Sequence, residues 1–318
     1  MSMKILVNDR ISQIGINALE NAGFEVNTTK VAQEQLIHYI NKNGIDILLV
    51  RSATQVGKDV LANCPSLKIV GRAGVGLDNI DVTYAKQKGI KVLNTPDASS
   101  ASVAELVFAH LFSGVRFVHD SNRSMPLEGD SKFNMLKKAY SKGVELKGKT
   151  LGIVGFGKIG QATAKIALGI GMHVIYHDHH REETTVKVSF FDGQSISFNL
   201  KNNSMEQLLK SADFISMHVP AQKQYAIGKN EFELMKDGVG IINTARGGVI
   251  DEVALVDALE NGKVLFAGLD VYESEPSPEI RILMHPQISL TPHIGGSTLE
   301  AQERVGMELA NLIIDQTK

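Results

Sequence analysis

Short runs of apolar residues, bounded by turn residues, recur along the chain, and segments with helical periodicity lie between most of them. Apolar runs that do not alternate with polar residues are typical of strands buried on both faces of a parallel sheet. We therefore predict an α/β fold with two doubly wound parallel-sheet domains covered by helices. The predicted strands begin at Lys4, Ile45, Leu67, Ile90, Thr150, Met172, Asp213, Val239, Leu265 and Ile288.

The pattern changes between Asn94 and Thr150. After NTPDASS, the stretch SVAELVFAHLFSGVRF predicts one long buried helix, with Ser102 and Glu105 spaced as in a capping box. The stretch that follows, MPLEGDSKFNMLKKAYSKGVELKGK, is more polar and less periodic, and is either a surface loop or an arm that packs on a second subunit. A second Gly-rich unit opens with the strand at Thr150, so we predict two domains and not a repeat array.

Composition narrows the class of protein. A chain of 318 residues with 43% hydrophobic residues is long enough for about two domains. The net charge of -2, without blocks of like charge, argues against a nucleic-acid surface. The single cysteine, Cys64, excludes an internal disulfide and fits a reducing compartment. The sequence shows neither a signal-peptide pattern nor an apolar run of about 18 residues, so we expect a cytoplasmic protein without a membrane partner.

The stretch LGIVGFGKIGQATAKIALGIGMHVIYHD carries the most specific motif. Gly155, Gly157 and Gly160 form G-x-G-x-x-G directly after a predicted strand and at the start of a helix. The first glycine allows a tight turn, the second lets the backbone approach a pyrophosphate, and the third lets helix and strand pack closely. The helix N-terminus then favours the phosphates. Asp178, which ends the next strand, can accept both ribose hydroxyls, so the motif predicts NAD rather than NADP.

The cluster around that acid, YHDHHRE, leaves two alternatives open. Arg181 can in principle meet the 2′-phosphate of NADP. His177 and His179 would project to one side of a strand and could belong to a metal site. No further ligand group at zinc-site spacing supports a metal, so we predict none and favour a polar strand end beside the adenosine.

Three further strand ends carry polar residues. NTARGGVIDE places Arg246 after a buried strand, followed by glycines 247–248, where we expect a substrate to approach the backbone. GLDVYESEP places Asp270 and Glu275 after the next strand, and TPHIGGST places His293 before a glycine pair. Because the carboxyl ends of parallel strands line the ligand crevice of a doubly wound sheet, we expect these side chains to converge at the nicotinamide end of the cofactor.

These residue types suit the oxidation of an alcohol beside a carboxylate. A guanidinium such as that of Arg246 binds a carboxylate with two hydrogen bonds. An imidazole such as that of His293 exchanges a proton with the hydroxyl, and a carboxylate such as that of Glu275 orients it and stabilises its charged form. Each residue alone has an ordinary structural explanation, respectively a salt bridge, a loop histidine and a solvated charge. Their joint position after the Gly-rich motif favours catalysis.

In their combination and order, the motifs resemble the D-isomer-specific 2-hydroxyacid dehydrogenase family over nearly the whole chain, and most of all its enzymes that oxidise D-3-phosphoglycerate. The motifs are RSATQV, GRAGVGLDNID, NTPDASSASVAE, ELKGKTLGIVGFGKIG, HVP, NTARGGVIDE, GLDVYESEP and TPHIGGST. The resemblance implies Arg246 as carboxylate binder, Glu275 as histidine partner and His293 as general acid and base. It also implies that, beyond the three glycines, the NAD site includes Lys158, Ile159, Asp178, His218, Val219, Pro220, Thr244, Ala245, Arg246, Asp270, His293, Gly295 and Gly296.

The resemblance also implies a domain arrangement. A flavodoxin-like substrate domain would comprise residues 1–98 and 297–318, and a Rossmann NAD domain, 99–296, would be inserted in it. A homodimer would form through an arm at about 117–148. The chain ends after one predicted C-terminal helix, so we expect no serine-sensing regulatory domain. Residues 184–204 alternate apolar and polar positions around DGQ and predict a β-hairpin, for which the sequence suggests no function.

The loop GRAGVGLDNID belongs to the predicted substrate domain. Backbone N–H groups of Gly74, Val75 and Gly76 can cup a carboxylate as a nest, with Arg72 beside them and Arg51 in the same domain. Together with Arg246, these arginines exceed the need of one carboxylate but suit a substrate that also carries a phosphate. We therefore expect Arg51 or Arg72 to bind that phosphate, the alternative being an ion pair at the domain edge.

Three functions remain open on the sequence alone. The first is NAD-dependent oxidation of D-3-phosphoglycerate to 3-phosphohydroxypyruvate, as in serine biosynthesis. The second is reduction of glyoxylate, hydroxypyruvate or another 2-keto acid to a D-2-hydroxy acid. The third is an NAD-sensing binding module of the corepressor type, which shares the fold and the triad. The absence of long disordered tails and the arginines suited to a phosphate argue against the third, and those arginines lead us to favour the first.

Overall fold

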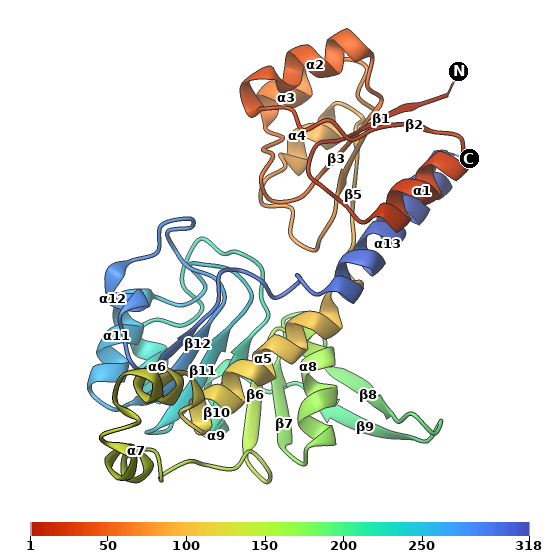
Figure 1. Ribbon diagram of the computed structural model, residues 1–318. Coiled ribbons are helices and arrows are strands. Elements are labelled where there is room, and N and C mark those ends of the chain that lie inside the picture. Colours follow the sequence, from red (N-terminus) through yellow and green to blue (C-terminus); the bar gives the residue numbers. More distant parts are fainter. Residues whose placement is uncertain (1, 318) are drawn as a thin grey trace. The chain divides into compact units, whose positions relative to one another are not determined.

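The computed structural model describes residues 2–317 and divides into two compact units (Figure 1). Unit 1 comprises Met1–Ser100 and Gly296–Lys318, and unit 2 comprises Ala101–Gly295. The predicted limits, 1–98 with 297–318 and 99–296, differ from these by two residues at the first boundary and by one at the second. The chain therefore leaves unit 1 once and returns to it for its last helix.

Unit 1 is built on a parallel five-stranded sheet with the order β2-β1-β3-β4-β5, the flavodoxin-like arrangement. Every side chain of the central strand β3 is buried, as expected for a strand with helices on both faces. Two apolar clusters form the core of the unit. The elements are β1 (Lys4–Val7), α1 (Gln13–Asn21), β2 (Glu25–Asn27), η1 (Gln33–Gln35), α2 (Leu36–Asn43), β3 (Ile47–Val50), α3 (Lys58–Asn63), β4 (Ile69–Arg72), α4 (Val82–Gln87), β5 (Lys91–Asn94) and α13 (Leu299–Thr317).

The predicted amphipathic C-terminal helix is confirmed as α13. Its apolar face, which includes Leu309 and Ile313, is fully buried in the core of unit 1. The helix crosses α1 closely, because a side chain added at Gly15 would stand 2.6 Å from the carbonyl oxygen of Gly306. Two glycines at the crossing therefore let the last helix of the chain pack on the first.

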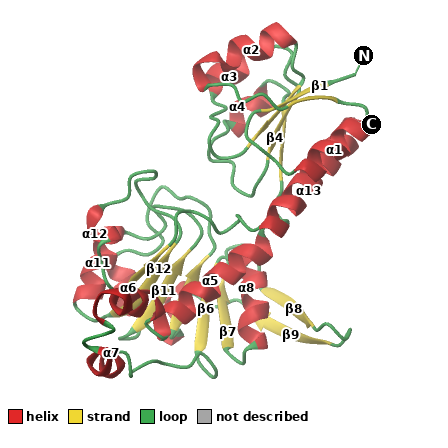
Figure 2. Cartoon of the chain, viewed as in Figure 1, coloured by secondary structure: helices red, strands yellow, loops and turns green. Residues whose placement is uncertain are grey.

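Unit 2 is built on a parallel six-stranded sheet with the order β13-β12-β11-β10-β6-β7. The direction of chain progression reverses between β6 and β10, and open sheets of this kind bind ligands beside such a reversal, at the carboxyl ends of the strands. Figure 2 shows the helices and strands by colour. The elements are α5 (Ser100–Val115), α6 (Val118–Glu128), α7 (Phe133–Ala139), β6 (Thr150–Val154), α8 (Lys158–Gly169), β7 (His173–His177), β8 (Glu183–Ser189), β9 (Ser195–Lys201), α9 (Met205–Ser211), β10 (Phe214–Met217), α10 (Lys229–Leu234), β11 (Val239–Asn243), α11 (Glu252–Glu260), β12 (Val264–Leu269), α12 (Ile280–Leu283) and β13 (Ile288–Leu290).

The predicted capping box at the start of α5 is wrong. The helix begins at Ser100, so Ser102 and Glu105 both lie inside it. The hydroxyl of Ser102 donates to the carbonyl oxygen of Gly295 (2.6 Å) and joins the two ends of unit 2. The Ser102 hydroxyl, which the capping-box motif assigned to the helix terminus, thus makes a tertiary contact that local spacing does not predict.

The stretch predicted as a loop or an arm contains the helices α6 and α7. They expose large apolar side chains, among them Val118, Leu127 and Phe133, with exposed fractions of 51%, 81% and 56%. This composition suits a surface that a second copy of the chain covers. The dimerisation arm at about 117–148 stays a prediction.

The predicted β-hairpin is confirmed. Strands β8 and β9 pair antiparallel from Glu183 with Lys201 to Ser189 with Ser195. The hairpin lies beside β7 and α8 at the edge of the six-stranded sheet (Figure 1). Its tip exposes Phe190 and Phe191, whereas Val186 is buried in the core of unit 2.

Within residues 2–317, no single helix is long and apolar enough to span a membrane. The helices α5 and α6 meet such a requirement of length and composition only when they are taken together across a bend of 57°.

Candidate active site

The three glycines of the Gly-rich turn meet different surroundings. A side chain at Gly155, which has a φ of +90°, would stand 2.5 Å from the carbonyl oxygen of His218, and one at Gly160 would stand 2.3 Å from that of Gly155. At Gly157, an added Cβ would meet no atom of the chain within 4 Å. The first and third positions are thus closed by the protein itself, whereas the second faces open space that a pyrophosphate can fill.

The helix α8 begins at the same turn, with Lys158 and Ile159 as its first residues. Its N-cap residue, Gly157, offers no side chain to the free N–H groups of the first helical turn. These groups and the positive end of the helix dipole form an anion site. The turn therefore fits the phosphates of a dinucleotide.

Asp178 follows β7 and receives two backbone hydrogen bonds. The N–H of Phe156 donates to Oδ2 (2.7 Å) and that of His180 donates to Oδ1 (2.8 Å). Partial burial alone would raise the pKa of this carboxyl group, but the two donors and the charge of Arg181 outweigh burial and hold the pKa below its usual value. Asp178 is therefore an ionised acceptor at the end of the strand, as binding of ribose hydroxyls requires.

The remaining predicted cofactor residues of unit 2 follow β10 and β11. His218, Val219 and Pro220 directly follow β10, the neighbour of β6, and Thr244 and Ala245 directly follow β11. The hydroxyl of Thr244 is buried, and no group within residues 2–317 bonds to it. Such an unsatisfied atom suits a bound partner. With the open space at Gly157, it shows that these residues fit NAD.

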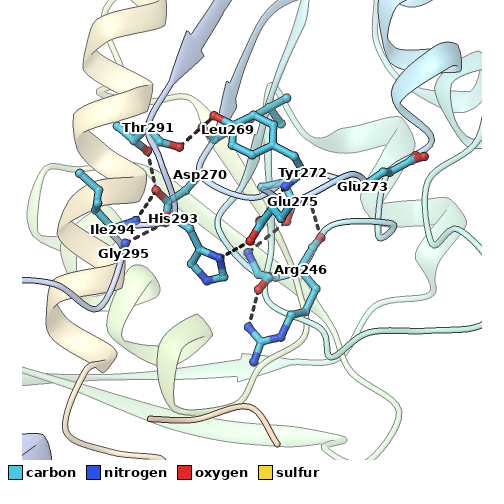
Figure 3. A network of polar contacts seen from close by, with 12 residues as sticks. Arg246, Leu269, Asp270, Tyr272, Glu273, Glu275, Thr291, His293, Ile294 and Gly295 are labelled. Carbon is cyan, nitrogen blue, oxygen red and sulfur yellow. Dashed lines mark hydrogen bonds and ion pairs between the residues drawn. The ribbon is translucent and has the colours of Figure 1, made fainter. Parts of the chain in front are cut away.

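Arg246, Glu275 and His293 stand at the carboxyl ends of adjacent strands. Arg246 lies after β11, Glu275 in the loop after β12, and His293 in the loop after β13. The Nδ1 of His293 lies 2.8 Å from Oε2 of Glu275, while Oε1 of Glu275 accepts the N–H of Tyr272 (3.0 Å). Figure 3 shows the imidazole pointing at this carboxylate, with the Arg246 side chain beside the pair.

The orientation of the imidazole decides which nitrogen can act. Because Nδ1 of His293 donates its proton to Glu275, the neutral ring carries its lone pair on Nε2. The side chain of His293 is 49% exposed, so Nε2 remains accessible. The guanidinium of Arg246 donates to the carbonyl oxygen of Ala245, which restrains the arginine near the pair. The structure thus brings together the three residues that the sequence proposed as catalytic.

Asp270 holds the loop that carries His293. Its Oδ1 accepts the hydroxyl of Thr291 (2.6 Å) and the N–H of Ile294 (2.8 Å), and its Oδ2 accepts the N–H of Gly295 (2.7 Å). Asp270 is 1% exposed, and this burial raises its pKa despite the three donors. His293 itself has a φ of +55°, a conformation that a non-glycine residue keeps only when its neighbours fix it. The resemblance placed Asp270 and Gly295 beside the cofactor; in the structure they also set the position of the imidazole.

Sequence reasoning missed His110, a residue of α5 with 2% exposure. Its Nε2 lies 3.1 Å from the hydroxyl oxygen of Thr291 and its Nδ1 lies 2.9 Å from that of Ser289. Thr291 gives its one hydroxyl proton to Asp270, so Nε2 of His110 must be the donor to Thr291. A single histidine within an apolar helix was the available signal, but the helix as a whole reads as core.

The buried His110 and the partly buried His218 predict an acid-sensitive fold. Burial lowers the pKa of His110 to about 4 and that of His218 to about 3, against 6.5 for an ordinary histidine. At pH values below about 6.5 and above the folded-state pKa of each histidine, the unfolded chain binds a proton that the folded chain does not bind. The free energy of unfolding therefore falls as the pH falls below about 6.5. Each proton contributes about 1.4 kcal/mol per pH unit.

We therefore expect His110→Gln to reduce the slope of the free energy of unfolding against pH. The reduction should correspond to almost one proton between pH 6 and about pH 4.5. Urea unfolding followed by far-UV circular dichroism at several pH values measures the slope, since the chain has no tryptophan for fluorescence. The exposed His173, changed to Gln, serves as the control and should keep the original slope. Equal slopes for the two variants would contradict a lowered pKa of His110 in the folded protein.

A second missed pair supports the loop of Glu275. The N–H of Glu252 donates to Oε1 of Glu273 (3.0 Å), and the N–H of Glu273 donates to Oε1 of Glu252 (2.8 Å). This reciprocal pair ties the first turn of α11 to the loop that follows β12. Burial raises the pKa of Glu252. Both glutamates lie within motifs quoted above, NTARGGVIDE and GLDVYESEP, but the motifs did not indicate this contact because it joins residues 21 positions apart.

Gly247 has a packing role that the sequence did not indicate. A side chain at this position would stand 1.9 Å from the carbonyl oxygen of Tyr272, so the glycine admits the backbone of the neighbouring loop, and the approach of a substrate to this backbone stays a prediction. Gly248 has a φ of +72°, a conformation that favours glycine for its own sake. Both glycines therefore serve the turn that presents Arg246.

The loop after β4, in unit 1, only partly fits the predicted nest. The N–H of Gly74 donates to the carbonyl oxygen of Arg72 (2.9 Å), so this group is not available to an anion. The guanidinium of Arg72 lies over Gly74, where an added Cβ would meet Nη1 at 2.1 Å. The carbonyl oxygen of Val75 accepts a hydrogen bond from the side-chain amide of Asn94 (2.7 Å), and Gly76 follows in the same loop. The expectation of three free N–H groups is thus wrong for Gly74.

Arg51 lies directly after β3, in a loop held by Asp9. The buried carboxylate of Asp9 accepts the N–H groups of Arg51 (2.8 Å) and Thr54 (3.0 Å). Within residues 2–317, the guanidinium of Arg51 has no hydrogen bond or ion pair. Gly296, the last predicted cofactor residue, also belongs to unit 1.

Comparison with known proteins agrees with the chemistry of this site. Residues 108–295 match the family model described as D-isomer specific 2-hydroxyacid dehydrogenase, NAD binding domain. A hydroxypyruvate reductase of Thermotoga maritima is 43% identical over 98% of this chain and 98% of its own length. A D-3-phosphoglycerate dehydrogenase of Methanocaldococcus jannaschii is 40% identical over 98% of this chain, which spans 57% of that longer protein.

Among solved structures, the NAD+-bound 3-phosphoglycerate dehydrogenase of Entamoeba histolytica has a TM-score of 0.77 and 28% identity, and the match covers 100% of this chain and 96% of that one. The family model lies over most of unit 2, including the Gly-rich turn, Asp178 and the residues Arg246, Glu275 and His293, which are labelled in Figure 3. The chain therefore belongs to the D-isomer-specific 2-hydroxyacid dehydrogenase family, as an NAD-dependent dehydrogenase.

Proposed function

We propose that the protein interconverts D-3-phosphoglycerate and 3-phosphohydroxypyruvate with NAD as the cofactor. One observation supports the oxidation and reduction chemistry: the 2.8 Å contact between His293 and Glu275, beside Arg246, at the ends of adjacent strands. The choice of a phosphorylated substrate depends on the arginines of unit 1 and on the resemblance to phosphoglycerate dehydrogenases.

Each residue of the site then has one task. Arg246 binds the carboxylate of the substrate through its planar guanidinium and polarises the neighbouring carbonyl group in the reverse direction. His293 removes the hydroxyl proton with Nε2 during oxidation and returns it during reduction. Glu275 holds Nδ1 and stabilises the imidazolium that forms. Hydride acceptance and donation is the chemistry that NAD supplies when bound.

For the phosphate, Arg51 is the better candidate of the two arginines. Its backbone is fixed by Asp9, and its guanidinium extends from the loop without an intramolecular partner in residues 2–317. The guanidinium of Arg72, by contrast, is packed over Gly74 with its Nε buried. A dianionic phosphate pairs strongly with an unengaged guanidinium.

A second candidate function is the reduction of hydroxypyruvate or glyoxylate. One specific observation favours it: the Thermotoga maritima relative named hydroxypyruvate reductase is 43% identical to this chain over 98% of both lengths, against 40% for the phosphoglycerate dehydrogenase of Methanocaldococcus jannaschii. Hydroxypyruvate differs from 3-phosphohydroxypyruvate only by the missing phosphate, and glyoxylate lacks the hydroxymethyl group as well. Steady-state rates of NADH oxidation with 3-phosphohydroxypyruvate, hydroxypyruvate and glyoxylate therefore separate them.

We expect kcat/KM to be highest for 3-phosphohydroxypyruvate. In Arg51→Ala we expect this constant to fall about 10²-fold, because an ion-paired hydrogen bond contributes about 1.5–3 kcal/mol. The constant for hydroxypyruvate should change less than threefold. Lys86→Ala, an exposed change on α4, is the matched control and should affect neither substrate. An equal loss on both substrates would assign Arg51 to the fold and remove the argument for a phosphate.

A further inference from the structure

The β8–β9 hairpin rejoins the sheet next to the residue that selects the cofactor. Asn202 follows β9, and its side-chain amide meets both backbone groups of Asp178. The N–H of Asp178 donates to Oδ1 of Asn202 (2.9 Å), and Nδ2 of Asn202 donates to the carbonyl oxygen of Asp178 (2.8 Å). Asp178 lies just beyond the end of β7, so the amide replaces the partner strand that the sheet no longer provides.

Neighbouring contacts make this attachment firm. Asn202 forms a parallel bridge with Tyr176, and the N–H of Asn203 donates to the carbonyl oxygen of Tyr176 (2.9 Å). The Nδ1 of His177 is hydrogen-bonded to the carbonyl oxygen of Asn203 (2.8 Å). The return of the hairpin thus continues the edge of the sheet beyond the last hydrogen-bonded pair of β7.

The same segment is joined to the Gly-rich turn. The ring of Tyr176 is fully buried and stacks on Phe156, with centroids 3.9 Å apart and an interplanar angle of 11°. The N–H of Phe156 donates to the carboxylate of Asp178 (2.7 Å). A displacement of Asp178 would therefore change both the acceptor for the ribose and the turn that meets the pyrophosphate.

We propose that Asn202 is a positioning residue for NAD: it fixes the backbone of Asp178 so that the carboxylate faces the adenosine ribose, and it thereby sets the preference for NAD over NADP. This inference rests on the proposed role of Asp178 as acceptor of the ribose hydroxyls. It gives the hairpin a function that its sequence did not suggest, and it confines that function to the base of the hairpin.

The variant Asn202→Ala tests the proposal. Loss of two hydrogen bonds to Asp178 should raise KM for NAD about tenfold and lower the ratio of kcat/KM between NAD and NADP. The kcat at saturating NAD and the KM for the keto acid should stay within twofold. An unchanged KM for NAD would overturn the proposal.

Asn199→Ala is the matched control in the same hairpin. The side chain of Asn199 accepts a hydrogen bond from Thr185 (2.8 Å) at an exposed position of the ribbon, away from Asp178. This variant should leave KM for both cofactors unchanged. If Asn199→Ala raised KM for NAD as much as Asn202→Ala, general stability of the hairpin and not the position of Asp178 would be the cause, and the proposal would be wrong.

A double-mutant cycle shows whether Asn202 acts through Asp178. We expect Asp178→Ala to raise KM for NAD, and the addition of Asn202→Ala to that variant to have no further effect. Independent, multiplying effects would contradict the inference. If Asp178→Ala alone left KM for NAD unchanged, the proposed role of Asp178 would itself fail, which is a separate result.

The variant Asn202→Asp provides a second test in case Asn202→Ala does not fold. It keeps an oxygen acceptor for the N–H of Asp178 but has no amide proton for the carbonyl oxygen. Its KM for NAD should lie between that of the native protein and that of the alanine variant. A KM for NAD equal to the native value would count against the proposal, because one of the two bonds is lost.

Discussion

Replacing His293 with Gln should lower kcat about 10²- to 10⁴-fold in both directions of the reaction, the usual contribution of a positioned acid and base. Glutamine preserves the size and polarity of the side chain but cannot exchange a proton near neutral pH. The Nδ1 contact with Glu275 (2.8 Å) leaves Nε2 as the atom that faces the substrate, so the loss should appear in the chemical step.

The measurement is single-turnover oxidation of NADH with the keto acid, together with a titration of NADH fluorescence to establish binding. NADH affinity should stay within about threefold, because Asp178 and the Gly-rich turn are unchanged. His173→Gln, at an exposed site at the start of β7, is the control and should keep full activity. If kcat of His293→Gln fell less than tenfold, another group would have to serve as the acid and base.

Replacing Arg246 with Lys should lower kcat/KM for the keto acid about 10²-fold, although the positive charge is retained. A lysine ammonium cannot form two parallel hydrogen bonds to a carboxylate, and each bond to a charged group contributes about 1.5–3 kcal/mol. The turn that presents Arg246 is fixed by the close approach of Gly247 to Tyr272 and by the hydrogen bond to Ala245. The flexible lysine stem has no equivalent restraint.

Steady-state kinetics over a range of keto-acid concentrations, at saturating NADH, measure this effect. Arg281→Lys, on the exposed side of α12, is the matched control with the same chemical change and should be neutral. Retention of native kcat/KM in Arg246→Lys would show that only charge matters at this position and would argue against two-point binding of the carboxylate.

The outline of the fold and the triad could be predicted from the sequence because both depend on topology. Arg246, Glu275 and His293 each follow an apolar strand, and a parallel sheet brings the carboxyl ends of its strands to one edge. The Gly-rich motif likewise specifies its own turn, strand and helix within one local segment. Strand β2 was missed because its three residues, one exposed and two partly buried, carry too little periodicity.

The supporting contacts could not be predicted, since each joins residues distant in sequence. Ser102 appeared to cap a helix and instead bonds to Gly295, and the close approach of Gly247 to the backbone of Tyr272 left no trace in the sequence. Asn202 gave no signal, and the lone histidine His110 gave no sign of its partners, because a hydrogen bond depends on distances that spacing along the chain does not specify. Such contacts hold the catalytic and cofactor residues in place, but only three-dimensional structure reveals them.

The hydrogen bond between Ser102 and Gly295 has a consequence for engineering and for evolution. It joins the first residues of unit 2 to the last, so the inserted half of the molecule enters and leaves through a single point. Segments whose ends adjoin can be exchanged between host scaffolds without rearrangement of their interior. Unit 2 is in this sense an exchangeable segment, and transplanting residues 101–295 between relatives would combine the cofactor-binding unit of one protein with the first and last segments of another.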